Sequence, residues 1–206
     1  MTNVINDDSS RDGTSLSQLH RALRDATKLS HHALDRHPLL APLLTRELTV
    51  MQYGAALAAL HGVYAQAEDV CLSFLDEHPG LFDYRSRRKL PALELDLAEL
   101  GRTGVPSRME FTAPQNIGAL IGILYTIEGS THGGQFIARS VRQLRGGNFP
   151  VRFFTGYGDR SSQNWKEFLA FAGDRCPAAE YEAATSTAMS LFQAIKDHLD
   201  AADRRP

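Results

Sequence analysis

The chain has 206 residues, of which 43% are hydrophobic and 22% charged, as in an ordinary globular domain. This length is enough for one well-buried core and short for two. A formal net charge of -2 at pH 7, without long Lys/Arg runs, argues against a nucleic-acid-binding surface. We therefore expect one soluble domain that does not bind nucleic acid.

The chain ends and the cysteines indicate a cytoplasmic protein. Residues 1–14 are polar and acidic and predict a disordered N-terminal tail, followed by a helical domain over 15–203. Neither a signal-peptide core nor a membrane span is recognisable. Cys71 and Cys176 lie far apart without a CxxC pattern, which fits two free structural thiols in a reducing compartment.

Hydrophobic periodicity near 3.6 recurs along almost the whole domain. Thr49 is expected to cap one of the helices, and Pro177 to open the last one. The best strand-like stretch is VRFF, at 151–154. The expected helices span residues 15–37, 38–47, 50–78, 86–101, 114–145, 164–173 and 178–200. The pattern predicts an all-α, single-domain helical bundle.

A short basic cluster precedes the helix expected at 86–101. Its members are Arg85, Arg87, Arg88 and Lys89. Basic clusters this short are typical of a solvated helix start, so we expect all four side chains to face water.

The first helix carries Arg24, Lys28 and His31 on one face, at i, i+4 and i+7. A rise of ~1.5 Å per residue places Arg24 roughly 10 Å from His31 along the axis. A histidine that ligates heme iron needs a cation at about this distance, because the ring's anionic propionates lose water there. Many amphipathic helices place a cation near a polar residue, so a surface role for His31 stays open.

The expected helix at 114–145 contains the stretch EGSTHGGQF, with three glycines in its interior. Each glycine costs a helix about 0.5–1 kcal/mol relative to alanine. Tyr125, Gly129, Gly133 and Phe136 share one face, at i, i+4, i+8 and i+11, and form a trench with aromatic residues at both ends. The trench serves either close helix packing or a flat cofactor lying on the helix backbone.

Both stretches together resemble the heme oxygenase family. ATKLSHHAL resembles the family's proximal helix, and LYTIEGSTHGGQF resembles its distal helix in the EGS form common in bacterial members. The two motifs lie about 100 residues apart, as in the family, and RFFTGYGDRSSQNWKEF is similar to the connector of phytochrome-associated bacterial members. The resemblance implies an all-helical fold with heme between the proximal and distal helices.

Residue by residue, the resemblance implies His31 as the proximal iron ligand and Arg24 as a propionate partner. Tyr125 matches a tyrosine that contacts a propionate in some bacterial members. Gly129 and Gly133 match the glycines whose backbone approaches the heme and its bound oxygen. These two glycines are assigned catalytic as well as heme-binding roles.

Other residues complete the expected site. Lys28 and Phe136 are assigned to heme binding from their places on the two faces. Ser130 is assigned a catalytic role in holding ordered water, although animal-type members have an aspartate at this position. His132 lies off the trench face, so we expect an outward or supporting role rather than a second iron ligand.

The resemblance implies cleavage of heme to biliverdin with release of CO and ferrous iron. The reaction uses O2 and electrons from an external donor, a ferredoxin or a reductase, and the product can feed a phytochrome. Two alternatives remain open at this point. One is a heme-storage or heme-sensing protein on the same scaffold, and the other is a helical enzyme or interaction bundle without a cofactor.

Overall fold

The computed structural model describes residues 9–204, with side chains from residue 18 onward. Every regular element in this range is helical, so the all-α bundle is confirmed. The helices are α1 (Ser9–Asp35), α2 (Val50–Glu77), α3 (Leu90–Glu99), α4 (Ile117–Arg145), α5 (Arg152–Thr155), α6 (Ser161–Arg175) and α7 (Tyr181–Asp203). Short 3-10 turns are η1 (Ala41–Leu44), η2 (Arg85–Arg87), η3 (Gly158–Arg160) and η4 (Ala178–Glu180).

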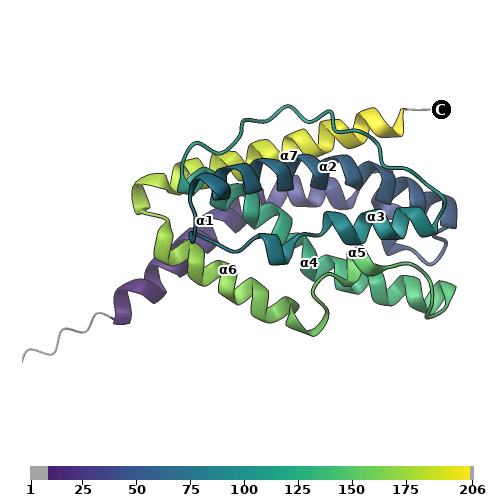
Figure 1. Ribbon diagram of the computed structural model, residues 1–206, viewed down its shortest axis with the longest axis horizontal. Helices are drawn as coiled ribbons and strands as arrows, with labels where there is room; N and C mark the ends of the chain where they lie inside the picture. The colour runs from purple at the N-terminus through teal and green to yellow at the C-terminus, as the bar shows by residue number, and fades with distance from the viewer. Residues whose placement is uncertain (1–8, 205–206) are drawn as a thin grey trace, which may run out of the picture.

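Helix α4 runs through the middle of the bundle and packs against α7, α6, α5 and α2 (Figure 1). Its first turn is capped by Asn116, whose side chain accepts a hydrogen bond from the Ala119 N–H at 2.8 Å. Most side chains from Gly118 to Glu128 are buried, whereas exposed residues appear from Ser130 onward. The first half of α4 therefore lies within the core, whereas the half from Ser130 onward buries only one side.

One expected helix start agrees with the structure and another shifts along the chain. Thr49 caps α2 through a capping box with Gln52, in which each side chain bonds the other residue's backbone N–H. The helix expected at 86–101 starts later, at Leu90, because Arg85–Arg87 form a separate 3-10 turn.

Two expectations near other helix limits change. The strand-like stretch VRFF is helical over most of its length, because Arg152–Thr155 form α5 and bury Phe153 and Phe154 in the core. The first helix begins at Ser9, and residues 1–8 of the expected tail lie outside the described residues.

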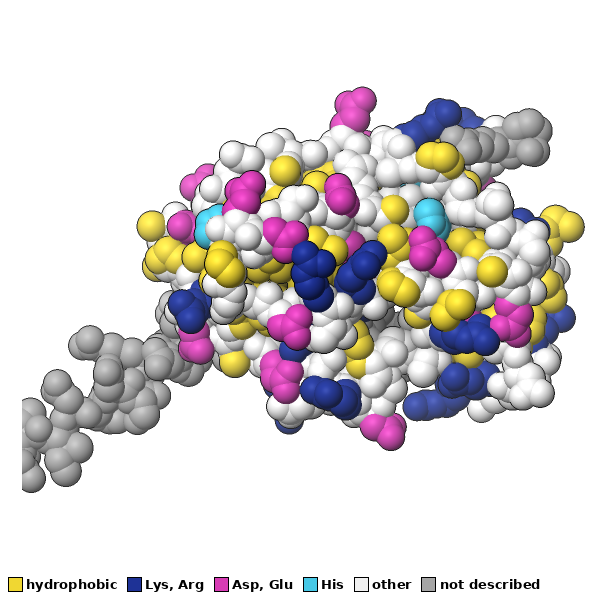
Figure 2. All heavy atoms as spheres, viewed as in Figure 1, with side chains coloured by type: hydrophobic (Ala, Val, Ile, Leu, Met, Phe, Trp, Pro, Cys, Tyr) yellow, Lys and Arg dark blue, Asp and Glu magenta, His cyan; other side chains and the backbone are white. Residues whose placement is uncertain are grey.

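The surface mixes charges of both signs. On the face shown in Figure 2, acidic and basic side chains are interspersed among scattered hydrophobic ones. Between residues 9 and 204, no helix has both the length and the apolar character of a membrane span. Cys71 and Cys176 are both buried and unpaired, as expected for structural thiols.

Candidate functional site

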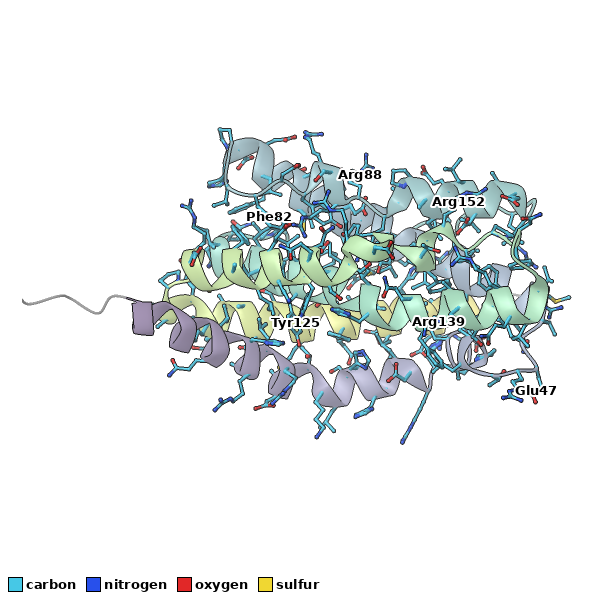
Figure 3. The ribbon with its side chains drawn as sticks, turned by 90° about the horizontal axis from the view of Figure 1, so that it is seen from below. Glu47, Phe82, Arg88, Tyr125, Arg139 and Arg152 are labelled. Atoms are coloured by element: carbon cyan, nitrogen blue, oxygen red, sulfur yellow. The ribbon has the colours of Figure 1, made fainter. Side chains whose placement is uncertain are left out.

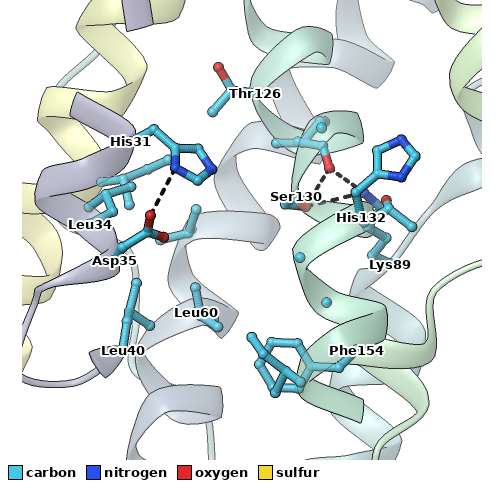
Figure 4. Close-up of a pocket in the computed structure, with 18 of the residues that line it drawn as sticks. His31, Leu34, Asp35, Leu40, Leu60, Lys89, Thr126, Ser130, His132 and Phe154 are labelled. Atoms are coloured by element: carbon cyan, nitrogen blue, oxygen red, sulfur yellow. Dashed lines mark hydrogen bonds and ion pairs between the residues drawn. The ribbon is translucent and has the colours of Figure 1, made fainter. Parts of the chain in front are cut away.

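A cavity of about 360 Å³ lies between α1 and α4 (Figure 4). Its remaining walls come from η1, α2, α5, α6 and α7. Aliphatic and aromatic side chains make up most of the lining: Leu34, Leu40, Leu43, Leu44, Leu60, Val63, Ile127, Ile137, Phe153, Phe154, Trp165, Phe192 and Ile195. A cavity of this kind suits a largely apolar ligand held by a few polar groups.

On the α1 wall, Thr27, His31, Leu34 and Asp35 face the cavity at helical spacing. The His31 Nδ1–H donates a hydrogen bond to Asp35 Oδ2 at 3.1 Å, which leaves Nε2 free. Metal-ligating histidines are commonly oriented by a carboxylate in this way. Asp35 was not expected at the site, although its i+4 spacing from His31 is the signal for this pairing.

On the opposite wall, Gly129 and Gly133 leave the α4 backbone bare toward the cavity. A Cβ added at Gly133 would meet nothing within 4 Å, and one at Gly129 would make only ordinary contact with the Trp165 ring at 3.8 Å. The protein's own packing therefore gives no reason for glycine at these two positions. The open space suits a ligand that lies against the helix backbone.

Other glycines of α4 have the packing role that the sequence left open. A Cβ at Gly118 would lie 2.5 Å from the Glu180 carbonyl oxygen, and one at Gly122 would lie 2.3 Å from that of Ala184. A Cβ at Gly134 would lie 3.0 Å from the Phe154 carbonyl oxygen. One pair of glycines thus brings α4 against the chain around η4 and α7, and a second pair opens the cavity.

A polar cluster interrupts the apolar lining at Ser130. The Ser130 Oγ lies 2.7 Å from the Tyr64 hydroxyl and 3.5 Å from Lys89 Nζ. Lys89 also donates to the Ile127 carbonyl. Burial raises the pKa of the Tyr64 phenol well above its ordinary value, so this hydroxyl keeps its proton.

Tyr64 and Lys89 were not expected at the site. The expectation of a solvated basic cluster is wrong for Arg87 and Lys89, which are 7% and 4% exposed. Arg87 donates to Glu167 at 2.7 Å and to the Asn164 carbonyl at 2.9 Å, which explains its burial. A lysine directly before the helix-starting Leu90 carries no sequence signal for burial, because the covering groups come from α2 and α4.

Tyr125 lies at another part of the cavity, between α1 and the Trp165 ring (Figure 3). Burial raises the pKa of its phenol, and a hydrogen bond with Thr27 and the Arg24 charge partly oppose this rise. Arg24 itself is exposed and pairs with Asp25 at 3.5 Å. Lys28 is exposed as well, and neither cation lines the cavity.

Phe136 does not border the trench, contrary to expectation. Its side chain is 59% exposed and lies outside the cavity lining. The lining face runs through Thr126, Gly133 and Ile137, so Phe136 points about 100° away from Ile137, its neighbour in the chain. His132 lies at the cavity, edge-on to the Trp165 ring with centroids 5.7 Å apart.

The donor set fits heme. An imidazole nitrogen is free on one wall, bare helix backbone faces it, and apolar side chains enclose the space between them. Imidazole is a common axial ligand of heme iron, and a flat ring needs the room that a Cβ at Gly129 or Gly133 would fill.

Sequence comparison finds a relative of known identity. A heme oxygenase from Xanthomonas campestris pv. campestris is 33% identical over 129 residues, which cover 60% of this chain and 73% of that protein. No protein-family model matches the sequence.

Solved heme oxygenase structures share the fold. The protein from Leptospira interrogans superposes with a TM-score of 0.69 at 15% identity, covering 89% of this chain and 98% of that one. The NO- and CO-bound protein from Neisseria meningitidis gives 0.72 at 18% identity, over 89% and 91%. Heme oxygenase-1 from the cyanobacterium Synechocystis, in complex with heme, gives 0.68 at 19% identity, over 91% of each chain.

Proposed function

The chain belongs to the heme oxygenase family, and we propose that it cleaves heme to biliverdin with release of CO and ferrous iron. The observation that carries this proposal is the pairing across one cavity of His31 with the bare backbone at Gly129 and Gly133. Bound heme supplies the iron that activates O2 and the ring that is opened. Electrons come from an external donor, a ferredoxin or a reductase, and biliverdin is available to a phytochrome.

The proposed role of His31 is to hold the iron through Nε2. Asp35 fixes the tautomer, because a carboxylate only accepts, so the proton must be on Nδ1. The same hydrogen bond makes Nε2 a stronger donor to a metal. The two residues are on one helix, so the ligand and its orienting group move together.

The proposed role of α4 is to bring the reacting edge of the ring close to a crowded, water-holding wall. Gly129 and Gly133 let the ring approach the backbone. Ser130 and Tyr64 present hydroxyls that can hold an ordered water at the cavity wall. Heme lying between the apolar side chains of the cavity would displace bulk water from this wall, which would strengthen these hydrogen bonds.

The proposed role of Tyr125 and Arg24 is to fix the rotation of the ring about its axis. Tyr125 offers a protonated phenol at the cavity, and the Arg24 charge lies close enough to influence its pKa. Lys28, one turn along the same helix face, adds a second exposed cation for a propionate.

Hemin titration followed by product analysis tests the function. Purified protein with hemin, O2 and either ascorbate or a ferredoxin–reductase pair should lose the Soret band and form biliverdin. Catalase is added so that free peroxide does not open the ring. Heme that binds tightly and stays intact with every donor would instead identify a storage or sensing protein, and absence of a Soret shift would contradict heme binding altogether.

Replacement of Ser130 by alanine tests the water-holding wall. We expect Ser130→Ala to lower the cleavage rate roughly 10–100-fold, because the hydroxyl that helps supply protons is lost. Heme affinity should stay within about twofold, since Ser130 makes no contact that holds the ring's apolar surface. Ser140→Ala makes the same change on α4 outside the cavity and should leave the rate unchanged. Equal rates in both variants would remove Ser130 from the mechanism.

A further inference from the structure

Lys89 is a buried cation in the wall of the cavity. It is 4% exposed and is the second residue after η2, and its side chain donates hydrogen bonds to the Ile127 carbonyl and to Ser130 Oγ of α4. Lysine is rarely buried without a partner or a task, because removal of its charge from water is costly. The position of Nζ beside Ser130 places this charge at the part of the wall that carries hydroxyls (Figure 4).

Hydrogen-bond counting shows what the ammonium does there. It carries three donors and no lone pair, so it accepts nothing from Ser130 or Tyr64. The two hydroxyl hydrogens have two arrangements. In one, Tyr64 donates to Ser130 Oγ and Ser130 donates to the Ile127 carbonyl at 2.8 Å, so neither hydrogen is free. In the other, Ser130 donates to Tyr64, and the Tyr64 hydrogen is available to a water or ligand in the cavity. Lys89 competes with Ser130 for the Ile127 carbonyl and therefore favours the second arrangement.

The surrounding charges leave the ammonium directed at Ser130. Glu128 accepts from the Tyr157 hydroxyl at 2.5 Å and from Arg87 at 3.4 Å. Glu68 accepts from the backbone N–H of Lys89 at 2.6 Å and from the side chain of Arg88 at 3.1 Å. Both carboxylates are thus engaged by other donors.

These groups also decide the charge state of Lys89. Burial lowers the pKa of Lys89, Glu128 and Glu68 oppose the fall, Arg87 adds to it, and together these groups bring the pKa to about 8. The Tyr64 and Tyr157 rings lie 5.9 and 5.4 Å from Nζ and favour the cation. The side chain is therefore charged below about pH 8 and neutral above it.

We propose that Lys89 is a positioning residue for heme cleavage, whose ammonium occupies the Ile127 carbonyl and thereby turns the Ser130 hydroxyl toward Tyr64, so that the Tyr64 hydroxyl donates into the cavity where a ligand on the heme iron would lie. This inference rests on the proposed function. Lys89 acts through Ser130 and Tyr64, so its loss should change the electrostatics of the ligand side rather than the hold on heme.

The free protein provides a test that does not need heme. The chain contains four lysines, and Lys28, Lys166 and Lys196 are all more exposed than Lys89. In protein labelled with 13Cε-lysine, replacement of each of these three lysines by glutamine, one at a time, identifies its NMR signal. The remaining signal is that of Lys89. We expect the Lys89 signal to titrate near pH 8 and to shift in Ser130→Ala. A signal that titrates near the ordinary lysine value, unmoved by Ser130→Ala, would overturn the inference whether or not the protein binds heme.

The ferric heme complex provides the second test. A nearby cation favours hydroxide over water on the iron, so Lys89→Met should raise the pH midpoint of the water–hydroxide spectral transition by about one unit. Cleavage should fall at least 10-fold at unchanged heme affinity. Arg88→Met is the control, because it removes the neighbouring cation, which pairs with Glu68 and does not line the cavity. This variant should change neither the pH midpoint nor the cleavage rate.

The outcomes separate the two proposals. A wild-type protein that does not cleave heme would contradict the proposed function. A wild-type protein that cleaves heme, with the same midpoint and rate in Lys89→Met, would contradict only the role of Lys89. If Lys89→Met does not fold, Lys89→Gln keeps the chain length and a polar head for the same measurements.

Discussion

Substitution of His31 by alanine is expected to lower the heme-cleavage rate more than 100-fold. The change removes the only imidazole on the α1 wall that has a nitrogen free toward the cavity among the described lining residues. A factor of 100 corresponds to about 2.7 kcal/mol, a modest figure for loss of a metal–ligand bond. Stopped-flow decay of the Soret band measures the rate. Added imidazole should restore part of it by occupying the space that the side chain leaves.

His32 offers a matched control on the same helix. Its side chain is 60% exposed against 62% for His31, and both lie near Asp35. It does not line the cavity, because successive residues of a helix point about 100° apart. His32→Ala should therefore keep both the Soret position and the rate. An equal loss in the two variants, or no loss in His31→Ala, would contradict the assignment of His31 as ligand.

The parts of the site that follow helical periodicity could be predicted from the sequence. Thr49 starts α2 through a local capping pattern, and His31 faces the cavity because α1 stays regular around it. The 3.6-residue repeat alone determines which residues share one face of a helix, and this repeat can be read from the sequence. Phe136 is the exception, because the lining face shifts along α4 toward Ile137 and a regular wheel does not include this shift.

The polar cluster could not be predicted in the same way. Lys89 lies between η2 and α3, where no periodic pattern assigns a buried face. Its burial arises from α2 and α4, which supply Tyr64, Ser130 and Ile127 from distant parts of the chain. The sequence also does not distinguish a glycine that allows close helix packing, such as Gly122, from one that opens the cavity, such as Gly133. That distinction depends on which atoms lie opposite each glycine in the folded chain.

These two glycines allow one change to be compared in two environments of the same helix. A Cβ at Gly122 would lie 2.3 Å from the Ala184 carbonyl oxygen and 3.0 Å from the Ala188 nitrogen, both in the backbone of α7. Backbone atoms in a helix cannot move aside singly, so α4 and α7 would have to separate. Gly122→Ala should therefore lower the free energy of unfolding by about 3 kcal/mol or more, with a fall in Tm of roughly 6–12 °C.

Gly133→Ala is expected to act in the opposite direction on stability and to impair function. The added methyl meets open space and raises helix propensity, so the free protein should gain about 0.5–1 kcal/mol and a slightly higher Tm. In the cavity the methyl occupies the place where the ring approaches the backbone, and heme affinity should fall about 10-fold, with a similar loss in cleavage rate. Calorimetry of the free protein and hemin titration measure the two effects. A stabilised variant with full heme affinity and activity would show that the bare backbone at Gly133 is not a heme-binding surface. A variant that is more stable but binds heme more weakly would show that glycine at this position serves heme binding at the expense of the stability of the fold.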